Sequence, residues 1–219
     1  MGKNKALLQN TKRLHFFYEE GEVWGHGGNR PRIVRIGTHR DGNFRSRMSE
    51  HFLLNESSMR FYVTSSRPHD RSIFRKNLGR ALLNRDGDSY LEMWNRDFIK
   101  GETRIRYQSQ RDIEKERKLE SEVTEILRKR FSFRFIIVVD QTERMGTSGL
   151  ESRLIGTVAH CDECSPSNHW LGLHSPIEKI SKGRLWLVQH LNSPPITDED
   201  REKIMSAITT TKAWIESFG

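Results

Sequence analysis

A run of β-branched and aromatic residues in the second half of the chain restricts the fold more than any other feature. The segment Phe133-Arg134-Phe135-Ile136-Ile137-Val138-Val139 is almost continuously apolar. Runs of this kind are typical of strands buried within a sheet. The sequence therefore predicts a β-sheet, and the apolar continuity of residues 133–139 favours a central place in it.

Two earlier segments are predicted to supply further strands. Residues 14–18 form an aromatic run that ends at Glu19-Glu20-Gly21, and residues 33–37 form a second apolar run that ends in glycine. The segment between them, residues 25–31, holds three glycines and a proline, which is loop composition. We expect a hairpin with a long tip.

Apolar residues at helical spacing predict the remaining elements. Phe44, Met48 and Phe52 are spaced i, i+4, i+8, which predicts one buried stripe on a helix over residues 44–54. Further helices are expected over residues 72–83, 111–130 and 150–160. Residues 185–188 are expected to form a short strand or a buried segment. Thr197 can cap a last helix, with Asp200 completing the capping box.

Charge and composition narrow the class of protein. The 219 residues include 37 Lys and Arg against 29 Asp and Glu, a formal charge of +8. A folded domain this basic favours polyanions, although positive charge can also serve solubility alone. The two cysteines are too few for a disulfide scaffold. No apolar run reaches the roughly 20 residues of a membrane span, and the first residues lack signal-peptide and myristoylation patterns, so we expect a cytoplasmic protein.

The order of strand, strand, helix, insertion, strand and helix resembles the GIY-YIG nuclease superfamily. Leu14-His15-Phe16-Phe17 and Arg35-Ile36-Gly37 stand where the family has its two name-giving motifs, with His15 and Arg35 at the positions of the tyrosines. Arg47-Met48-Ser49-Glu50-His51 resembles the Arg-x-x-x-His of the family's first helix. Glu151 resembles its metal-binding glutamate, and Asn168 its active-site asparagine.

The resemblance implies an α+β fold in which helices flank a small, mostly antiparallel three-stranded sheet. It implies a single nuclease domain, with a core over residues 13–52 and 131–190. Residues 53–130 then form a helical insertion that grips nucleic acid, and residues 191–219 a C-terminal helix. The implied activity is a metal-dependent endonuclease, with Mg²⁺ or Mn²⁺ held by Glu151. DNA is favoured over RNA as the substrate. A role in restriction or phage defence and a homodimer are both compatible with this reading.

Hydrolysis of a phosphodiester needs a water nucleophile, positive charge and a proton acceptor. Arg47 and His51 lie i, i+4 on one helix face and can supply a cation beside a proton carrier. The alternative is that both only decorate a solvated face. Because the motif tyrosines are absent, His15, His39 and His51 are candidate bases, followed by Tyr18.

The carboxylate of Glu151 has a structural alternative of its own. Ser148-Gly149-Leu150-Glu151 matches a capping box, in which Glu151 would only answer the cap at the helix start. A single carboxylate also suits magnesium that keeps most of its water. The catalytic interpretation therefore depends on Glu151, Arg47, His51 and Asn168 together.

Basic residues supply the expected contacts with the nucleic acid backbone. In the predicted helix over residues 72–83, Arg75, Lys76 and Arg80 are expected on the solvent side. An ordinary charged helix face is the alternative. The candidates are Arg35 and Arg45 in the core and Arg67, Arg71, Arg75, Lys76, Arg80 and Arg85 in the insertion.

Cys161-x-x-Cys164, flanked by His160 and His169, raises the question of zinc. A structural site takes four ligands, commonly from two paired motifs, and there is no second cysteine pair. Cysteines that pack the loop, with Trp170 anchoring it, are the preferred interpretation. Two other functions stay open: a nucleic-acid-binding module without catalysis, and a zinc-organised interaction protein.

Overall fold

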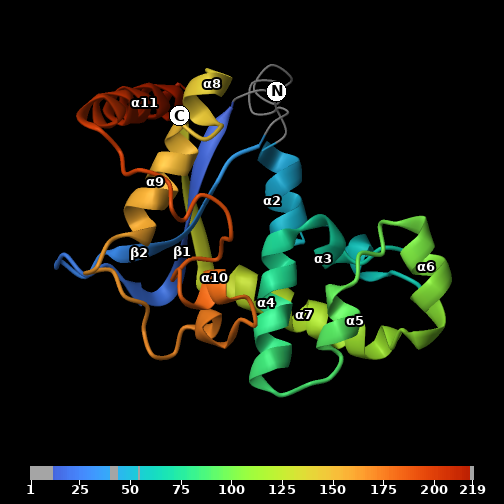
Figure 1. Cartoon of the computed structure of the whole chain (residues 1–219). Helices are drawn as coiled ribbons and strands as arrows, with labels where there is room; N and C mark the ends of the chain where they lie inside the picture. The colour runs from blue at the N-terminus through green and yellow to red at the C-terminus, as the bar shows by residue number, and fades with distance from the viewer. Residues whose placement is uncertain (1–11, 40–43, 54, 218–219) are drawn as a thin grey trace. The chain divides into compact units, whose positions relative to one another are not determined.

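The computed structural model describes residues 12–39, 44–53 and 55–217, which fall into two compact units (Figure 1). The first unit takes its residues from 1–47, 132–167 and 183–219, and the second from 48–131 and 168–182. Helix α2 (Phe44–Phe52) runs from the first into the second. The predicted start-site features of residues 1–6 lie outside the described residues.

The first unit contains the sheet and three helices of the described chain. Its elements are β1 (Arg13–Val23), β2 (Pro31–Gly37), β3 (Phe131–Ile137, of which Phe131 is assigned to the second unit), α8 (Gln141–Arg144), α9 (Leu150–Ala159) and α11 (Asp198–Glu216). The other elements are η1 (Glu56–Met59), α3 (Pro68–Arg71), α4 (Ile73–Arg85), α5 (Leu91–Asn95), α6 (Gly101–Tyr107), η2 (Gln108–Gln110), α7 (Ile113–Arg130), η3 (Leu171–His174) and α10 (Glu178–Ser181).

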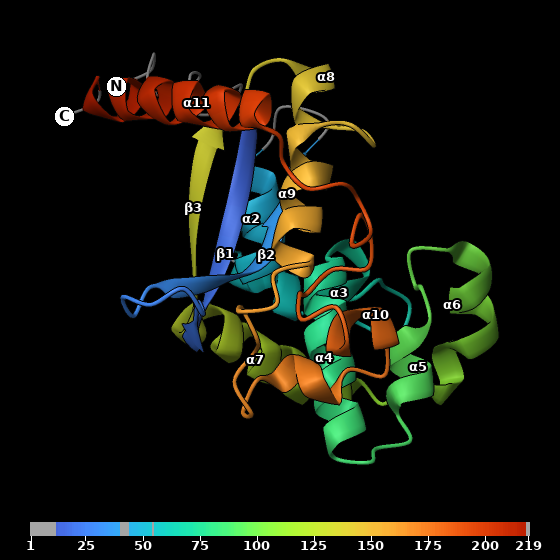
Figure 2. The same cartoon turned by 60° about the vertical axis from the view of Figure 1, so that its left-hand side comes forward.

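The strands form a three-stranded sheet in the order β2-β1-β3. Strands β1 and β2 are an antiparallel hairpin, as predicted, with His15 opposite Gly37. Strand β3 runs beside β1 in the opposite direction (Figure 2). The prediction that this apolar run is central was wrong, because β1 is the middle strand. Strand β3 is buried at its two ends, at Phe131 and at Ile136 and Ile137, whereas residues 132–134 are exposed.

One apolar cluster holds the first unit together. Leu14 of β1, Ile36 of β2 and Ile136 of β3 meet Leu150 and Ile155 of α9 in it. The segment 185–187 is buried in the same cluster, and its Trp186 amide donates to the Val34 carbonyl. That segment is therefore a buried connection, one of the two predicted outcomes. Burial of apolar area at about 25 cal/mol per Å² is what holds these elements on the sheet.

Helix α11 is fixed at its start and along its length. Thr197 and Asp200 form the predicted capping box. The Asp200 carboxylate also pairs with Arg153 of α9 at 3.2 Å. Further along α11, the Thr211 hydroxyl accepts a hydrogen bond from the Ile137 amide of β3. No helix among the described residues has the length and apolarity needed to cross a membrane.

The second unit is built on α4 and α7, which pack against each other. Its core includes Phe74, Leu78 and Trp94, all at 0% exposure. Gly79 is required here because an added Cβ would lie 2.3 Å from the Trp94 ring. Trp170, 1% exposed, is buried in this unit as predicted for an anchor of its segment.

Buried charge distinguishes the second unit. Arg75 of α4 is fully buried, and its guanidinium donates to the carboxylate of Glu120 on α7. Arg67 and Arg111 both pair with Glu116 of α7. We call these five residues the arginine–glutamate network.

The arginine–glutamate network corrects one sequence prediction. Arg75 and Lys76 were expected on the solvent side of the helix, but they are only 0% and 8% exposed. Arg75 is buried because it neutralises Glu120, 45 residues along the chain. Lys76 directs its ammonium group to the Arg96 carbonyl. Helical periodicity predicts apolar stripes and gives no information on such distant partners.

Candidate active site

The first part of the candidate site is a pair of buried histidines. His15 lies on β1 and His39 directly follows β2, and their rings stack with centroids 6.4 Å apart. Both are almost fully buried, at 2% and 5% exposure. Gly37, opposite His15 in the hairpin, leaves room for the ring, because a Cβ there would lie 2.7 Å from His15 Nε2. The motif glycine thus gives His15 its space.

Both imidazoles are held in the neutral form. Burial, followed by the charges of Arg35 and Arg47, lowers the pKa of His15 to about 3. Burial, with the charge of Arg144 next in size, lowers the pKa of His39 to about 4. His15 Nδ1 and both ring nitrogens of His39 have no hydrogen-bond partner within the described part of the chain. Neutral, unpartnered ring nitrogens can accept a proton.

Glu151 lies in the first turn of α9, where its environment is more specific than a helix cap. The N-cap of α9 is Gly149, with no side-chain cap bond, so the predicted capping box with Ser148 is wrong. The Glu151 carboxylate instead accepts a hydrogen bond from the backbone N–H of Thr38, which follows β2. Burial raises the pKa of Glu151, while Thr38 and the charges of Arg35 and Arg144 oppose that rise.

Arg35 belongs to the candidate site and lies on β2, an edge strand of the sheet. It donates to the backbone carbonyl of Trp186. Burial lowers the pKa of Arg35 to about 10, which the negative charge of Glu151 counteracts. The guanidinium therefore stays charged at neutral pH, and its charge interacts with the carboxylate of Glu151.

Arg144 belongs to the candidate site and was not found from the sequence. It is 0% exposed on α8, and its guanidinium donates to the Val138 carbonyl at 2.7 Å and to Thr38 Oγ at 2.9 Å. Thr38 thus contacts both Arg144 and Glu151. A single arginine after a strand carries no motif, so only the fold reveals it.

Two predicted site residues belong to the second unit. His51 is 5% exposed, and its Nδ1 lies 2.7 Å from Ser72 Oγ. The alternative that it decorates a solvated helix face is therefore wrong, whereas Arg47 is exposed. Asn168 is exposed at the start of the 168–182 segment. The geometry of the candidate site accordingly rests on first-unit residues: His15, Arg35, His39, Arg47, Arg144 and Glu151.

The predicted nucleic-acid contacts divide by exposure. Arg45 and Arg71 are exposed, while Arg80 is half-buried and donates to two asparagine side chains. Arg85 is exposed and pairs with Asp86 at 2.7 Å. Arg67 and Arg75 are inside the arginine–glutamate network. A phosphate could reach these last two only by breaking buried ion pairs.

The donors of the candidate site fit a hard divalent cation. Glu151 offers carboxylate oxygen, and burial makes its negative charge costly without a cation beside it. Magnesium needs few protein ligands, because it keeps several waters and binds substrate phosphate. The remaining ligands would come from water and the phosphodiester.

Comparison with known proteins identifies the family of the chain. A family model described as GIY-YIG domain matches residues 5–213. Searches of curated proteins and of solved structures found no match. Members of this family are typically endonucleases, and they generally use divalent metals. The match spans nearly the whole chain, including the helical segment between the two parts of the predicted core, and so the chain belongs to the GIY-YIG family.

Proposed function

We propose that this protein is a divalent-metal-dependent endonuclease that hydrolyses DNA phosphodiesters. The observation that carries the proposal is the setting of Glu151, a half-buried carboxylate that interacts with the charges of Arg35 and Arg144. It shares the first unit with two neutral histidines. Together these groups supply a place for a cation, fixed positive charge and a proton acceptor.

Positive charge from arginine stabilises the transition state in this proposal. Arg47 is exposed, yet its charge still acts on His15, His39 and Arg35. It can therefore bind a phosphate that arrives from solvent. Hydrolysis adds negative charge to the non-bridging oxygens, so fixed guanidinium groups bind the transition state more strongly than the substrate.

We assign proton removal from the attacking water to His39. Both of its ring nitrogens lack a partner among the described residues, whereas in His15 only Nδ1 does, and Nε2 lies beside Gly37, 2.7 Å from where a Cβ would stand. A phosphodiester entering beside His39 adds negative charge, which raises the pKa of the imidazole and makes it a better base. His15 then keeps His39 in place through the stacked ring contact.

Glu151 would hold the divalent cation, with Mg²⁺ as the assigned ion and Mn²⁺ as a substitute. When bound, the cation supplies positive charge to the phosphate and to the leaving oxygen. The Thr38 N–H fixes the orientation of the carboxylate. Arg144 in turn holds Thr38 through its hydroxyl.

DNA as substrate and a restriction or phage-defence role rest on the family and on charge. The net charge of +8 favours a polyanion. Arg45 and Arg71 remain exposed for backbone contacts. We place the first phosphate contacts on Arg45 and Arg47, which lie in the first turn of α2.

The test is a cleavage assay with supercoiled plasmid, single-stranded DNA and single-stranded RNA, each with Mg²⁺, Mn²⁺ or EDTA. We expect metal-dependent cutting of DNA that is lost in Glu151→Gln and Arg47→Ala. Glu216→Gln and Arg201→Ala, exposed changes on α11, are the matched controls and should cut normally. Loss in His39→Asn with retention in His15→Asn would support His39 as the base, and the reverse would transfer the role to His15.

A binding module without catalysis is the rival function, motivated by the replacement of both motif tyrosines by His15 and Arg35. It predicts DNA binding that is unchanged by EDTA or by Glu151→Gln, with no cutting under any metal. Binding measured by fluorescence anisotropy on the same variants separates the two functions. Metal-independent binding without cutting would overturn the endonuclease proposal in favour of a binding module.

A further inference from the structure

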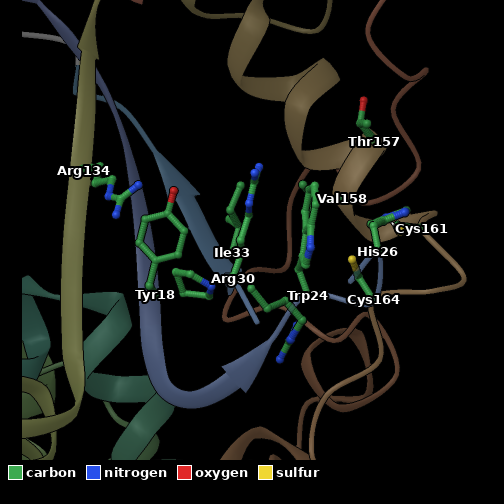
Figure 3. A pocket seen from close by; sticks show the side chains of 12 residues that line it. Tyr18, Trp24, His26, Arg30, Ile33, Arg134, Thr157, Val158, Cys161 and Cys164 are labelled. Atoms are coloured by element: carbon green, nitrogen blue, oxygen red, sulfur yellow. Dashed lines mark hydrogen bonds between the residues drawn. The ribbon is translucent and has the colours of Figure 1, made fainter. Parts of the chain in front are cut away.

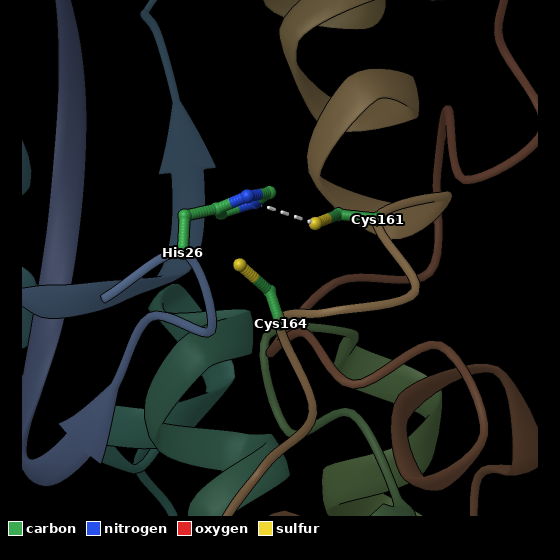
Figure 4. A group of neighbouring side chains, drawn as sticks. All are labelled: His26, Cys161 and Cys164. Carbon is green, nitrogen blue, oxygen red and sulfur yellow. Dashed lines mark hydrogen bonds between the residues drawn. The ribbon is translucent and has the colours of Figure 1, made fainter.

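A second cluster of metal-binding side chains lies in the first unit. His26, at the tip of the β1–β2 hairpin, meets Cys161 and Cys164, which follow α9 (Figure 4). One ligand atom from each residue lies within 4.8 Å of the other two. His26 Nε2 faces Cys161 Sγ at 3.1 Å. These residues are separate from Glu151 and play no part in the proposed hydrolysis.

We propose that His26, Cys161 and Cys164 bind one zinc ion and leave its fourth position to a ligand from solvent. Two thiolates and one imidazole are zinc ligands in many proteins. Zn–S and Zn–N bonds of about 2.3 and 2.1 Å imply ligand atoms roughly 3.5–4 Å apart in a tetrahedron. The 3.1 Å between His26 Nε2 and Cys161 Sγ needs only a small opening to reach this spacing, and no pair of ligand atoms is more than 4.8 Å apart.

The surroundings of the cluster orient its ligands. Glu163 pairs with His26 Nδ1 at 3.0 Å, which leaves Nε2 directed at the cysteines. A carboxylate on the distal nitrogen is the usual partner of a metal-bound histidine. The Gly25 amide donates to Cys164 Sγ at 3.5 Å, a contact that favours the thiolate.

The loop carrying the cysteines is held in place before any metal binds. Glu22 of β1 accepts hydrogen bonds from the Ser167 hydroxyl and from Arg32. Arg184 donates to the Cys161 carbonyl. An added Cβ on Gly25 would lie 1.7 Å from the Glu163 carbonyl oxygen, so the hairpin tip and the cysteine loop are in close contact. A site prepared in this way loses little entropy when zinc binds.

The open fourth position follows from the count of ligands and from a neighbouring cavity. The metal-binding group found within the described residues has three members. All three line a cavity of about 620 Å³ together with Trp24, Tyr18 and Arg134 (Figure 3). Zinc with three protein ligands and a solvent ligand is the arrangement of sites that accept an exogenous group.

This inference changes the ligand set expected from the sequence. His160 and His169, the histidines beside the cysteine pair, are both exposed and are not members of the cluster. His26 is 135 residues from Cys161, within a glycine-rich loop. Its sequence position gives no sign of this pairing, and only the hairpin brings it to the cysteines.

The test uses the full chain purified under reducing conditions, stripped with a chelator and reloaded with zinc. We expect one zinc per chain by elemental analysis and loss of that zinc in Cys161→Ser and in His26→Ala. His160→Ala and His169→Ala are matched controls that should keep it. Glu163→Gln should weaken zinc binding about tenfold, the lower end of the range for such partners, because Glu163 is 64% exposed.

Cobalt substitution tests the coordination without relying on any variant that fails to fold. The wild-type chain with Co²⁺ should show thiolate-to-cobalt absorption, and an added small ligand such as azide should shift the cobalt bands. Three results would overturn the proposal: no zinc in the reloaded wild type, zinc retained in Cys161→Ser, or a Cys161–Cys164 disulfide that forms in the presence of zinc. Cobalt bands insensitive to azide would overturn the open fourth position.

Discussion

Two clusters of buried charged or titratable side chains, one in each unit, are partnered differently. In the arginine–glutamate network, Arg67, Arg75 and Arg111 each pair with a carboxylate, and the partners have no side-chain exposure. In the candidate site, His15 and His39 keep ring nitrogens without a partner among the described residues. Buried polar groups are normally satisfied, and an exception needs an explanation. The arginine–glutamate network therefore stabilises the fold, whereas the unpartnered ring nitrogens of His15 and His39 mark a place where a ligand can bind.

The pKa values show the same contrast. Burial alone would raise the pKa of Glu120, but Arg75 and His69 outweigh it and lower the pKa to about 2. Burial also raises the pKa of Glu151, and there Arg35 and Arg144 do not outweigh it. Glu120 is therefore neutralised by its own protein. The carboxylate of Glu151 is not fully neutralised by its neighbours, so a bound cation would stabilise its charged form.

The largest expected effect is on catalysis. Glu151→Gln keeps the shape of the side chain but removes its charge, so the plasmid-nicking rate should fall by about 10³-fold or more, equivalent to about 4 kcal/mol. The thermal midpoint should stay level or rise, because the uncharged amide is easier to bury. Nicking time courses and melting curves measured side by side check this. A stable variant with undiminished nicking would contradict the assignment.

Glu120→Gln, in contrast to Glu151→Gln, should lower the stability of the fold. Removing the charge that neutralises Arg75 leaves a buried guanidinium unpaired, which costs about 3–5 kcal/mol of unfolding free energy. Chemical denaturation monitored by circular dichroism measures the loss. Glu125→Gln, which breaks an exposed i, i+4 pair with Lys129 on the same helix, is the control and should barely change stability. If Glu120→Gln and Glu125→Gln lost equal stability, the arginine–glutamate network would contribute no more than the exposed Glu125–Lys129 pair.

Gly37→Ala should have a moderate effect on the candidate site. The new Cβ would lie 2.7 Å from His15 Nε2, so the ring must move, at a cost of about 1–3 kcal/mol. Denaturation midpoints and nicking rates should both decline. Gly101→Ala at the start of α6 meets its nearest atom at 3.9 Å and serves as the control with no loss. If Gly37→Ala matched this control, the close approach of His15 would be wrong.

Stability is also expected to depend on pH through His39. The folded-state pKa of His39 is about 4, below its usual 6.5, so unfolding takes up a proton between these values. The resulting stability is complete above about pH 6.5 and is lost as the pH falls toward about 4. His39→Asn should flatten this part of the profile, measured as melting temperature from pH 4 to 7. His174→Asn, exposed in the second unit, should leave it unchanged.

Local patterns in the sequence predicted the elements well. The hairpin, helices α4, α7 and α9, and the capping box of Thr197 all occur close to their predicted positions. The buried stripe of Phe44, Met48 and Phe52 is 9%, 4% and 9% exposed. Each of these features depends on residues within a few positions of one another, which is the range that periodicity and capping describe.

The sequence predictions failed where a feature depends on contacts between residues far apart in the chain. The place of β3 at the sheet edge depends on which strand its backbone meets, not on how apolar it is. Glu151 matched a capping box, yet its partner Thr38 lies more than one hundred residues earlier. The resemblance predicted one catalytic site, because the family supplied the fold that periodicity could not. Its predicted residues were His15, His39, Arg47, His51, Glu151 and Asn168, and the last of these and His51 lie in the second unit.

The hydrogen bond between the Ile137 amide and Thr211 has a consequence for the fate of the chain during synthesis. An open strand edge invites pairing with a strand of another molecule. At one end of β3, α11 covers a backbone donor, and α11 is synthesised after β3. Until it docks, the nascent protein presents β3 with Phe133 partly exposed and only the charge of Arg134 as a deterrent to self-association. We therefore expect the docking of α11 to limit self-association through this strand edge.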